Sequence, residues 1–366
     1  ERERRGRGRR GASGVRDSIL TTCLLALLGI VFGRVTERER DALVSIYEAT
    51  NGPEWFDNSN WLSGDPCAPG AAWFGLYEVG GVLPCVNTIG EIRFSSNGLR
   101  GDLPDVFAAF KRVDAIRFID ESITGQIPVS LFHPPLLRSL DVTNCHVTST
   151  IPTDVGRATN LRSLFLSNDP FTVRKRFYGS IPSEISRCTQ LEDLFLNGNR
   201  FDPPFPPEMV SLVNMKSISA DTAFIASDQP FPTFVCEWRD LQSMVFTNMF
   251  IRDVLPSCLG YLSLLTSLHA GINSISSTIP STLSSLSELR VLELFSNNIS
   301  GPLPDVIWGG MKQLLYFDVS GNPISGTLSP YISNASTLET LQMSNCLLSH
   351  TIPSNLGRLS RLQSLQ

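Results

Sequence analysis

Apolar residues recur along most of the chain in a unit of about 24 residues. They occupy positions 1, 4, 6 and 11 of the unit, with Asn or Cys at position 9, Gly at 13 and Ile-Pro or Leu-Pro at 15 and 16. The segment from Ile89 to Pro104 fits every marked position. The same register starts again at 113, 137, 161, 191, 215, 241, 265, 289, 314 and 338, and a twelfth unit begins at Leu362. Internal repetition of this length predicts a solenoid.

The most regular marker of the repeat is its proline. Ten of the eleven units carry it, namely Pro104, Pro128, Pro152, Pro182, Pro206, Pro232, Pro256, Pro280, Pro304 and Pro353. Positions 1, 4 and 6 predict a short strand with apolar side chains turned inward, while positions 2, 3, 5, 7 and 8 face outward. Strands of successive units are expected to stack in parallel, about 4.8 Å apart. The proline lies on the far side of each coil, where no sheet hydrogen bond is needed.

Position 9 is the polar member of the repeat. It is occupied by Asn97, Asn199, Asn273, Asn297 and Asn322, with Cys145 and Cys346 in the same place. The amide of asparagine has both a donor and an acceptor on a short stem, so stacked asparagines can satisfy backbone groups where the chain turns inward. We expect Cys145 and Cys346 to be buried thiols, because they lie too far apart along the solenoid to meet.

The unit LxxLxLxxNxLxGxIP resembles the plant-type leucine-rich repeat of receptor-like kinase ectodomains, receptor-like proteins and polygalacturonase inhibitors. The resemblance covers about residues 89–366. It implies an α/β repeat solenoid, a curved superhelix with a parallel sheet on its concave face and a helical N-terminal cap. Members of this family share a scaffold and differ in ligand, so the repeat alone does not identify what is bound.

Residues 34–88 are similar to the N-terminal cap of that family. Apolar residues have helical spacing between Asp41 and Thr50, and Trp55, Trp61, Trp73, Cys67 and Cys85 follow. In the family, a helix and a disulfide cover the open core of the first repeat, which implies a Cys67–Cys85 disulfide here. The segment between Trp73 and Cys85 is longer than the usual one.

A second disulfide is predicted within the repeats. Cys236 and Cys258 follow the prolines of adjacent units by four and two residues. Because neighbouring coils bring these positions together, we pair them. Cys188 has no obvious partner in the sequence.

The N-terminus, residues 1–33, reads as a signal peptide or signal anchor. An arginine-rich stretch ends at Arg16, and the largely apolar run from Ile19 to Gly33 is short for a membrane span. Either alternative puts the repeats on the outer side, secreted or at the cell surface. The sequence stops at Gln366 within the strand of the twelfth unit, so we expect the natural chain to continue. A membrane span or a kinase domain there is compatible with this interpretation.

Two further features bear on compartment and partners. Asn298-Ile-Ser300 and Asn334-Ala-Ser336 are acceptors for N-glycosylation, so Asn298 and Asn334 are candidate modification sites. After residue 33 the chain has 23 basic and 32 acidic side chains, a net charge of about −9. A surface of this sign repels phosphate backbones, which argues against a nucleic-acid partner.

The sequence gives no indication of catalysis. The four histidines occupy unrelated positions of the repeat, which disfavours a histidine-based metal site. Phosphate-binding, nucleophile-elbow and kinase motifs are absent from the 366 residues. Carboxylates on the strand face are spread over eight repeats, too far apart for an acid–base pair. We therefore expect a protein that is not an enzyme over this range and needs no cofactor or metal.

The candidate binding surface is the outward side of the strands. A basic end with Arg93, Arg117, Arg138 and Arg162 leads to two phenylalanines that we expect to be exposed, followed further along by an acidic end. The proposed ligand-binding residues are Arg93, Arg117, Phe165, Phe195, His269, Glu293, Phe295 and Asp318. Aromatic residues and arginine are typical anchors of interfaces. The alternative is that these are ordinary surface residues, since strands favour phenylalanine in any case.

Three functions fit these features. The first is a receptor ectodomain that binds a protein or peptide ligand, with a co-receptor as a further candidate partner. The second is a secreted inhibitor of a foreign wall-degrading enzyme, and the third is a structural protein of a cell wall or surface coat. Contact with a membrane would come only from an N-terminal anchor or a span beyond Gln366.

Overall fold

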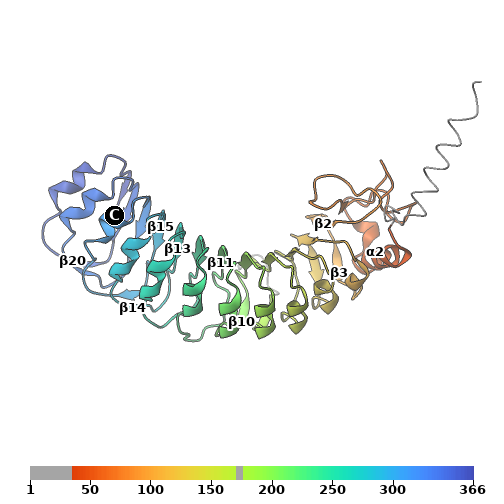
Figure 1. The fold of residues 1–366 in the computed structure, drawn as a ribbon, viewed down its shortest axis with the longest axis horizontal. Coiled ribbons are helices and arrows are strands. Elements are labelled where there is room, and N and C mark those ends of the chain that lie inside the picture. The colour runs from red at the N-terminus through yellow and green to blue at the C-terminus, as the bar shows by residue number, and fades with distance from the viewer. Residues whose placement is uncertain (1–34, 170–175) are drawn as a thin grey trace, which may run out of the picture.

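The computed structural model describes residues 35–169 and 176–366, which form an arc of stacked coils (Figure 1). The predicted signal segment at 1–33 lies outside the described residues. The arc begins with helix α2 (Glu37–Ala49), which buries Leu43 and Ile46. Thr36 caps this helix, because its hydroxyl accepts from the backbone N–H of Glu39 while its own N–H donates to the Glu39 carboxylate. The helical cap expected from the sequence is therefore present.

One parallel sheet lines the concave side of the arc. Its strands in spatial order are β1 (Leu76–Tyr77), β2 (Glu91–Ser95), β4 (Ala115–Ile119), β6 (Ser139–Asp141), β7 (Ser163–Phe165), β9 (Asp193–Phe195), β11 (Ser217–Ser219), β12 (Ser243–Val245), β13 (Ser267–His269), β15 (Val291–Glu293), β17 (Tyr316–Asp318), β19 (Thr340–Gln342) and β21 (Ser364–Leu365). Only β1 runs antiparallel to its neighbour in this sheet, and it belongs to the cap. This confirms the curved solenoid with a parallel concave sheet.

The strands of the main sheet pair without offset. Arg93 pairs with Arg117, and Arg117 pairs with Asp141, so equal positions of the repeat form straight rows across the sheet. The fourth unit is six residues longer than the usual step, yet Phe165 on β7 still pairs with Phe195 on β9. The additional length is therefore taken up outside the sheet.

The side of each coil opposite the strand is formed mostly by a short 3-10 helix. These elements are η1 (Gly52–Glu54) in the cap, then η2 (Phe107–Ala109), η3 (Val129–Phe132), η4 (Thr153–Arg157), η5 (Ser183–Arg187), η6 (Pro207–Ser211), η7 (Thr233–Glu237), η8 (Ser257–Tyr261), η9 (Ser281–Ser285), α3 (Ile307–Gly310), η10 (Pro330–Asn334) and η11 (Ser354–Arg358). The repeat proline is the N-cap residue of most of them, as at Pro152 and Pro256. Its fixed φ sets the direction of entry into the helix.

Short two-stranded parallel sheets lie between the concave strands and the prolines. They pair β3 (Arg100–Asp102) with β5 (Ser122–Thr124), β8 (Tyr178–Ser180) with β10 (Arg200–Asp202), β14 (Ser276–Ser277) with β16 (Asn298–Ile299), and β18 (Ser325–Gly326) with β20 (Leu347–Leu348). They add a second set of backbone hydrogen bonds between neighbouring coils, in addition to those of the main sheet. The repeat pattern did not lead us to expect them.

Position 9 forms the predicted polar ladder inside the solenoid. The Nδ2 of Asn199 donates to Leu166 O at 2.8 Å and Leu196 O at 2.7 Å, and its Oδ1 accepts from Phe177 N at 3.1 Å. Cys145 takes the same place and its Sγ lies 3.3 Å from Phe118 O.

Glu121 is a member of this ladder that the sequence reasoning missed. Its buried carboxylate accepts from Asn97 N at 2.7 Å and Leu99 N at 2.8 Å. Burial raises the pKa of Glu121, although these backbone hydrogen bonds oppose the change. An ionised carboxylate can accept hydrogen bonds but cannot donate them. Glu121 therefore binds backbone N–H groups of the previous coil and, unlike asparagine, no carbonyl oxygens.

Both predicted disulfides are present, Cys67–Cys85 in the cap and Cys236–Cys258 between η7 and η8. Cys145 and Cys188 are free and buried. Cys346 is only half-buried, which corrects the expectation of a buried thiol, because it lies close to the open end of the described coils. Among residues 35–169 and 176–366, no helix combines the length and apolar character needed to cross a membrane.

The buried thiols are expected to resist alkylation in the native protein. Burial raises the pKa of Cys145 and of Cys188 to about 12, so at pH 8 only about one thiol in ten thousand is the reactive thiolate. Iodoacetamide followed by peptide mapping should label Cys346 well before either of them, and denaturant should remove the difference. Equal native labelling of the three cysteines would contradict the burial.

Candidate ligand-binding surface

Seven of the eight predicted binding residues lie on strands of the concave sheet, and Phe295 lies two residues after the end of β15. Because the strands pair without offset, Phe165 lies beside Phe195 and His269 lies beside Glu293. Strands β11 and β12 separate these two pairs. The predicted residues therefore form an N-terminal group, a central aromatic pair and a C-terminal group, not one compact site.

Glu91 organises the N-terminal group. Its side chain is 2% exposed and receives the Nε of Arg93 at 2.7 Å together with the guanidinium of Arg117. Arg93 also donates to Gly81 O at 2.7 Å and lies over the ring of Tyr77, 4.5 Å from its centroid. These two arginines are therefore not free, because a shared carboxylate binds both of them and the cap binds Arg93, and their role in ligand binding stays a prediction.

The charges around Glu91 determine its protonation. Burial alone would raise the pKa of Glu91, but the hydrogen bond from Arg93 and the charges of Arg117 and Arg93 together hold it below its ordinary value. A carboxyl whose pKa is lower in the folded state stabilises the fold above its unfolded pKa. That contribution is lost as the pH falls through the folded value.

Glu91→Gln is therefore expected to lower the free energy of unfolding at pH 7 by about 1–3 kcal/mol, because it leaves two arginines without their counter-charge. The difference from the wild type should shrink as the pH falls from the ordinary glutamate pKa of about 4.3 down through the lower folded pKa of Glu91, where Glu91 itself takes up a proton. Urea unfolding at several pH values measures it. Glu237→Gln, in an exposed and longer pair with Arg239, serves as the control. A deficit that is the same at pH 3 and pH 7 would refute the ion-pair explanation.

Phe165 and Phe195 form the central feature of the surface. Their ring centroids are 5.1 Å apart and the rings are nearly parallel, at 24°. Both side chains are half-buried and not exposed as expected, since each covers one face of the other. Asp141 and Ser219 are their register neighbours on either side. Burial raises the pKa of Asp141, opposed by its hydrogen bonds with Thr143.

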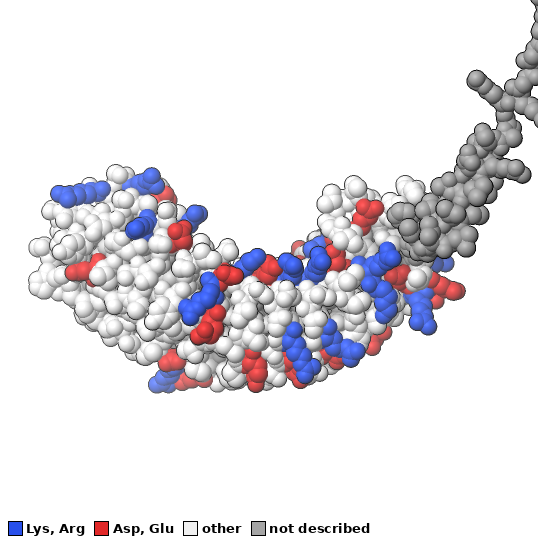
Figure 2. Space-filling view, viewed as in Figure 1, with Lys and Arg blue, Asp and Glu red and all other residues white. Residues whose placement is uncertain are grey.

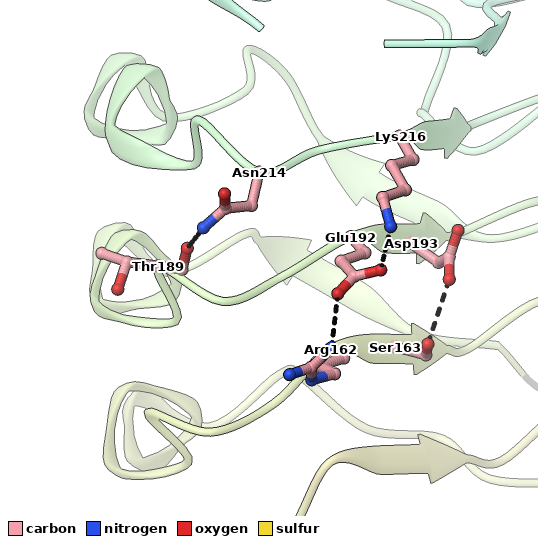
Figure 3. A network of polar contacts seen from close by, with 7 residues as sticks. All are labelled: Arg162, Ser163, Thr189, Glu192, Asp193, Asn214 and Lys216. Atoms are coloured by element: carbon pink, nitrogen blue, oxygen red, sulfur yellow. Dashed lines mark hydrogen bonds and ion pairs between the residues drawn. The ribbon is translucent and has the colours of Figure 1, made fainter. Parts of the chain in front are cut away.

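A polar network connects the strands that carry the two phenylalanines (Figure 3). Glu192 accepts from Arg162 at 2.9 Å and from Lys216 at 2.6 Å, so one carboxylate spans three neighbouring coils. The hydrogen bond from Lys216 is the main cause of the lowered pKa of Glu192. Beside it, the Ser163 hydroxyl donates to Asp193 at 3.1 Å. Arg162, expected in the basic end, is thus also paired.

The C-terminal group is less exposed than the sequence suggested. His269 Nδ1 lies 2.6 Å from Glu293 Oε2. Phe295 lies over Gly271, where a Cβ would come within 2.5 Å of the ring. Asp318 is buried and accepts from Ser320 N at 2.8 Å, so the expectation that it contributes to an acidic end is wrong. An aspartate two residues before a turn can bind the turn's own backbone instead of facing solvent.

Charge on the face is accordingly balanced. Figure 2 shows basic and acidic side chains interleaved along the concave edge of the arc, with further charged side chains along its convex edge. Among the described residues, no group of His, Cys, Asp and Glu is arranged to hold a metal ion. Chemically, the surface offers apolar contact at the aromatic pair and hydrogen bonds from the hydroxyl and amide groups around it.

Comparison with known proteins agrees with this geometry. Residues 288–309, 313–335 and 337–359 match the family model described as Leucine Rich Repeat. The fold is the leucine-rich-repeat solenoid. No curated protein sequence gives a significant match to the chain.

Several solved structures share the fold of this leucine-rich-repeat chain. The Arabidopsis receptor kinase HAESA, solved in complex with the peptide hormone IDA and the co-receptor SERK1, has a TM-score of 0.78 and 23% identity over 90% of this chain and 53% of its own. A TDR receptor has a TM-score of 0.69 and 26% identity, covering 76% of this chain and 47% of its own. A plant ice-binding protein has a TM-score of 0.63 and 21% identity, covering 90% and 95%.

The chain spans between 34 and 53% of the length of the first three receptor structures. The receptors and the ice-binding protein show that one scaffold carries different ligands. The shared fold therefore does not identify the ligand of this chain.

Proposed function

We propose that this leucine-rich-repeat solenoid binds a protein or peptide ligand on its concave face, as the ectodomain of a cell-surface receptor. The stacked pair of Phe165 and Phe195 carries the proposal. Two large apolar side chains lie on the outward side of a rigid sheet, where the packing of the core does not require them. Complexes of similar receptor ectodomains with peptide hormones support the same kind of ligand.

The geometry of the pair favours a peptide over a sugar. Carbohydrates stack on the open face of an aromatic ring. Here the rings of Phe165 and Phe195 cover each other, and their outer faces lie next to Asp141 and Ser219. The ring edges that remain suit an apolar side chain of a ligand. Hydroxyl and amide groups in the adjacent rows, such as Ser163 and Asn197, can bind its backbone.

The platform is also rigid before binding. Phe165 and Phe195 are on paired strands, and the Arg162–Glu192–Lys216 network joins the same coils. Asn197 Oδ1 accepts from Ser219 Oγ and from Asp221 N, both at 2.8 Å. Side chains held in this way lose little conformational freedom when a ligand docks, which favours affinity.

The extracellular location is part of the proposal. Two disulfides fit an oxidising compartment. Asn298 on β16 and Asn334 at the end of η10 are exposed, so each can accept a glycan. Both lie outside the concave strands, and glycans there would leave the proposed binding surface open.

The test is selection from a displayed library of linear twelve-residue peptides on the immobilised full chain. We expect the wild type to enrich a defined set of sequences and the double variant Phe165→Ala with Phe195→Ala to enrich none of them. Its melting temperature should stay close to that of the wild type, because the rings pack on each other and not in the core. Synthetic copies of the enriched peptides then give dissociation constants.

Tyr261→Ala is the matched control, because this aromatic ring is exposed on the opposite side of the solenoid, at the end of η8. Peptide binding should be unaffected by it. If the wild type enriches no peptides, or if the Phe165/Phe195 double variant binds them as tightly as the wild type, the proposed site is wrong.

A further inference from the structure

The segment between Trp73 and Cys85, longer than the family's usual one, forms a hairpin at the N-terminal end of the concave face. We call residues 76–86 the cap hairpin. Its first strand, β1, pairs antiparallel with β2, and Tyr77 also bridges to Pro84. Figure 1 shows the loops of the cap rising above β2 on the concave side of the arc, facing the C-terminal coils across the hollow.

The cap hairpin is firmly held against the sheet. Arg93 donates to Gly81 O at 2.7 Å, and Gly90 N donates to Tyr77 O at 2.8 Å. Packing is so close that a Cβ on Gly90 would lie 2.0 Å from Val79 N. Gly81 has φ +65° and sits directly over the Glu91 carboxylate. These contacts fix the hairpin before any ligand is present.

The tip of this rigid hairpin is apolar and open to solvent. Val82 is 84% exposed, Val79 is 64% exposed and Leu83 is 60% exposed. Three large apolar side chains held together on a fixed turn are unfavourable in water and gain by contact with a partner.

We propose that Val79, Val82 and Leu83, here called the hairpin tip, form a second anchor point for the same extended peptide that packs on Phe165 and Phe195. This inference rests on the proposed function and adds to it the form of the ligand. The peptide runs along the solenoid axis, across the strands, with one apolar anchor at each end of the N-terminal half of the face.

Strand spacing gives the separation of the strands that lie beneath the two anchors. From β2, which carries the hairpin, the sheet takes three steps to β7 and four to β9. At about 4.8 Å a step this is about 14 to 19 Å, which an extended chain covers in about four to six residues. The peptide crosses the Glu91–Arg93–Arg117 cluster on the way, where both arginines share one carboxylate.

The proposal is tested with a synthetic peptide enriched by the wild-type chain from the twelve-residue library. The full chain with Val82→Ser and Leu83→Ser should bind it about tenfold more weakly or worse, because two apolar contacts are lost. These side chains are exposed, so the substitutions should not change the fold. Val210→Ser with Val213→Ser, two exposed apolar residues on and just after η6, is the matched control and should leave the affinity unchanged.

A truncated peptide separates direct contact from an indirect effect. Removing the residues of the anchor assigned to the hairpin tip should weaken binding to the wild type, and the shortened peptide should bind wild type and the Val82/Leu83 variant equally. A shortened peptide that still distinguishes the two proteins would overturn the direct contact.

The remaining outcomes are distinct from failure of the proposed function. If the Val82/Leu83 variant binds the full peptide like the wild type while the Phe165/Phe195 variant does not, the hairpin inference fails and the proposed function stands. If neither variant affects binding, both fail. A wild-type dimer in sedimentation that the Val82/Leu83 substitutions convert to a monomer would assign the tip to a second copy of the chain and also overturn the inference.

Discussion

Trp238→Ala should lower the free energy of unfolding by about 3–5 kcal/mol, the largest effect that we expect for a single substitution. Trp238 is completely buried at the end of η7 and packs against Phe234, with ring centroids 5.2 Å apart. Its indole N–H donates to Met209 O at 3.2 Å, in the previous coil. Alanine would leave a cavity in the middle of the solenoid and remove one of the two hydrogen bonds that Met209 O accepts, since Leu212 N still donates to it.

Equilibrium unfolding in urea, followed by circular dichroism, measures this effect. Trp238→Phe should cost less, since it keeps most of the volume and loses only the hydrogen bond. Tyr331→Ala, which removes an exposed ring from η10, is the control and should change the stability little. A Trp238→Ala protein as stable as the Tyr331→Ala protein would show that this part of the core is not packed as described.

Asn199→Ala is the second large effect, expected at about 3 kcal/mol. The substitution leaves Leu166 O, Leu196 O and Phe177 N without the partner that the Asn199 amide provides in the interior. Buried backbone groups without partners are costly because nothing replaces the water that they lose. The coils on both sides of Asn199 should then show faster amide hydrogen exchange than the cap.

Asn214→Ala is the matched comparison for Asn199→Ala. The Asn214 amide makes one hydrogen bond at the surface, 2.7 Å to Thr189 O, where water can take its place (Figure 3). Its loss should cost well under half as much. Similar costs for the two asparagines would mean that the ladder contributes no more than a surface contact.

Much of the fold was predictable because every repeat contains the apolar, polar and proline positions that one coil needs in order to form. The spacing of apolar residues gave the strands, and the concave pairing of Phe165 with Phe195 follows from equal positions in adjacent units. The pairing of Cys236 with Cys258 also followed from counting residues after each proline. These features depend on one coil or on two neighbours, so a local pattern is sufficient to predict them.

The errors concern side chains whose surroundings come from elsewhere in the chain. Arg93 and Arg117 occupy outward positions, but both bind the carboxylate of Glu91, and Arg93 also binds the cap hairpin. Asp318 also occupies an outward position and turns back to a nearby backbone N–H. The position of a residue on a strand determines the face from which its side chain projects. The partners of that side chain determine whether it stays exposed to solvent.

Glu121 illustrates a different limit. A glutamate at position 9 departs from the Asn or Cys of the pattern, and nothing in the repeat says that its carboxylate would bind two N–H groups of the previous coil. Its position alone was a usable signal. A charged residue in an otherwise buried row must either find donors or disrupt the row.

The unshifted pairing of β7 and β9 has a consequence for how such a chain can be altered. The six additional residues of the fourth unit leave the strands where a unit of ordinary length would put them. Foreign segments grafted at the corresponding place in other coils should therefore leave the pattern of side chains on the face intact. The loops beside the sheet and the side chains on the concave face could then be changed independently of each other.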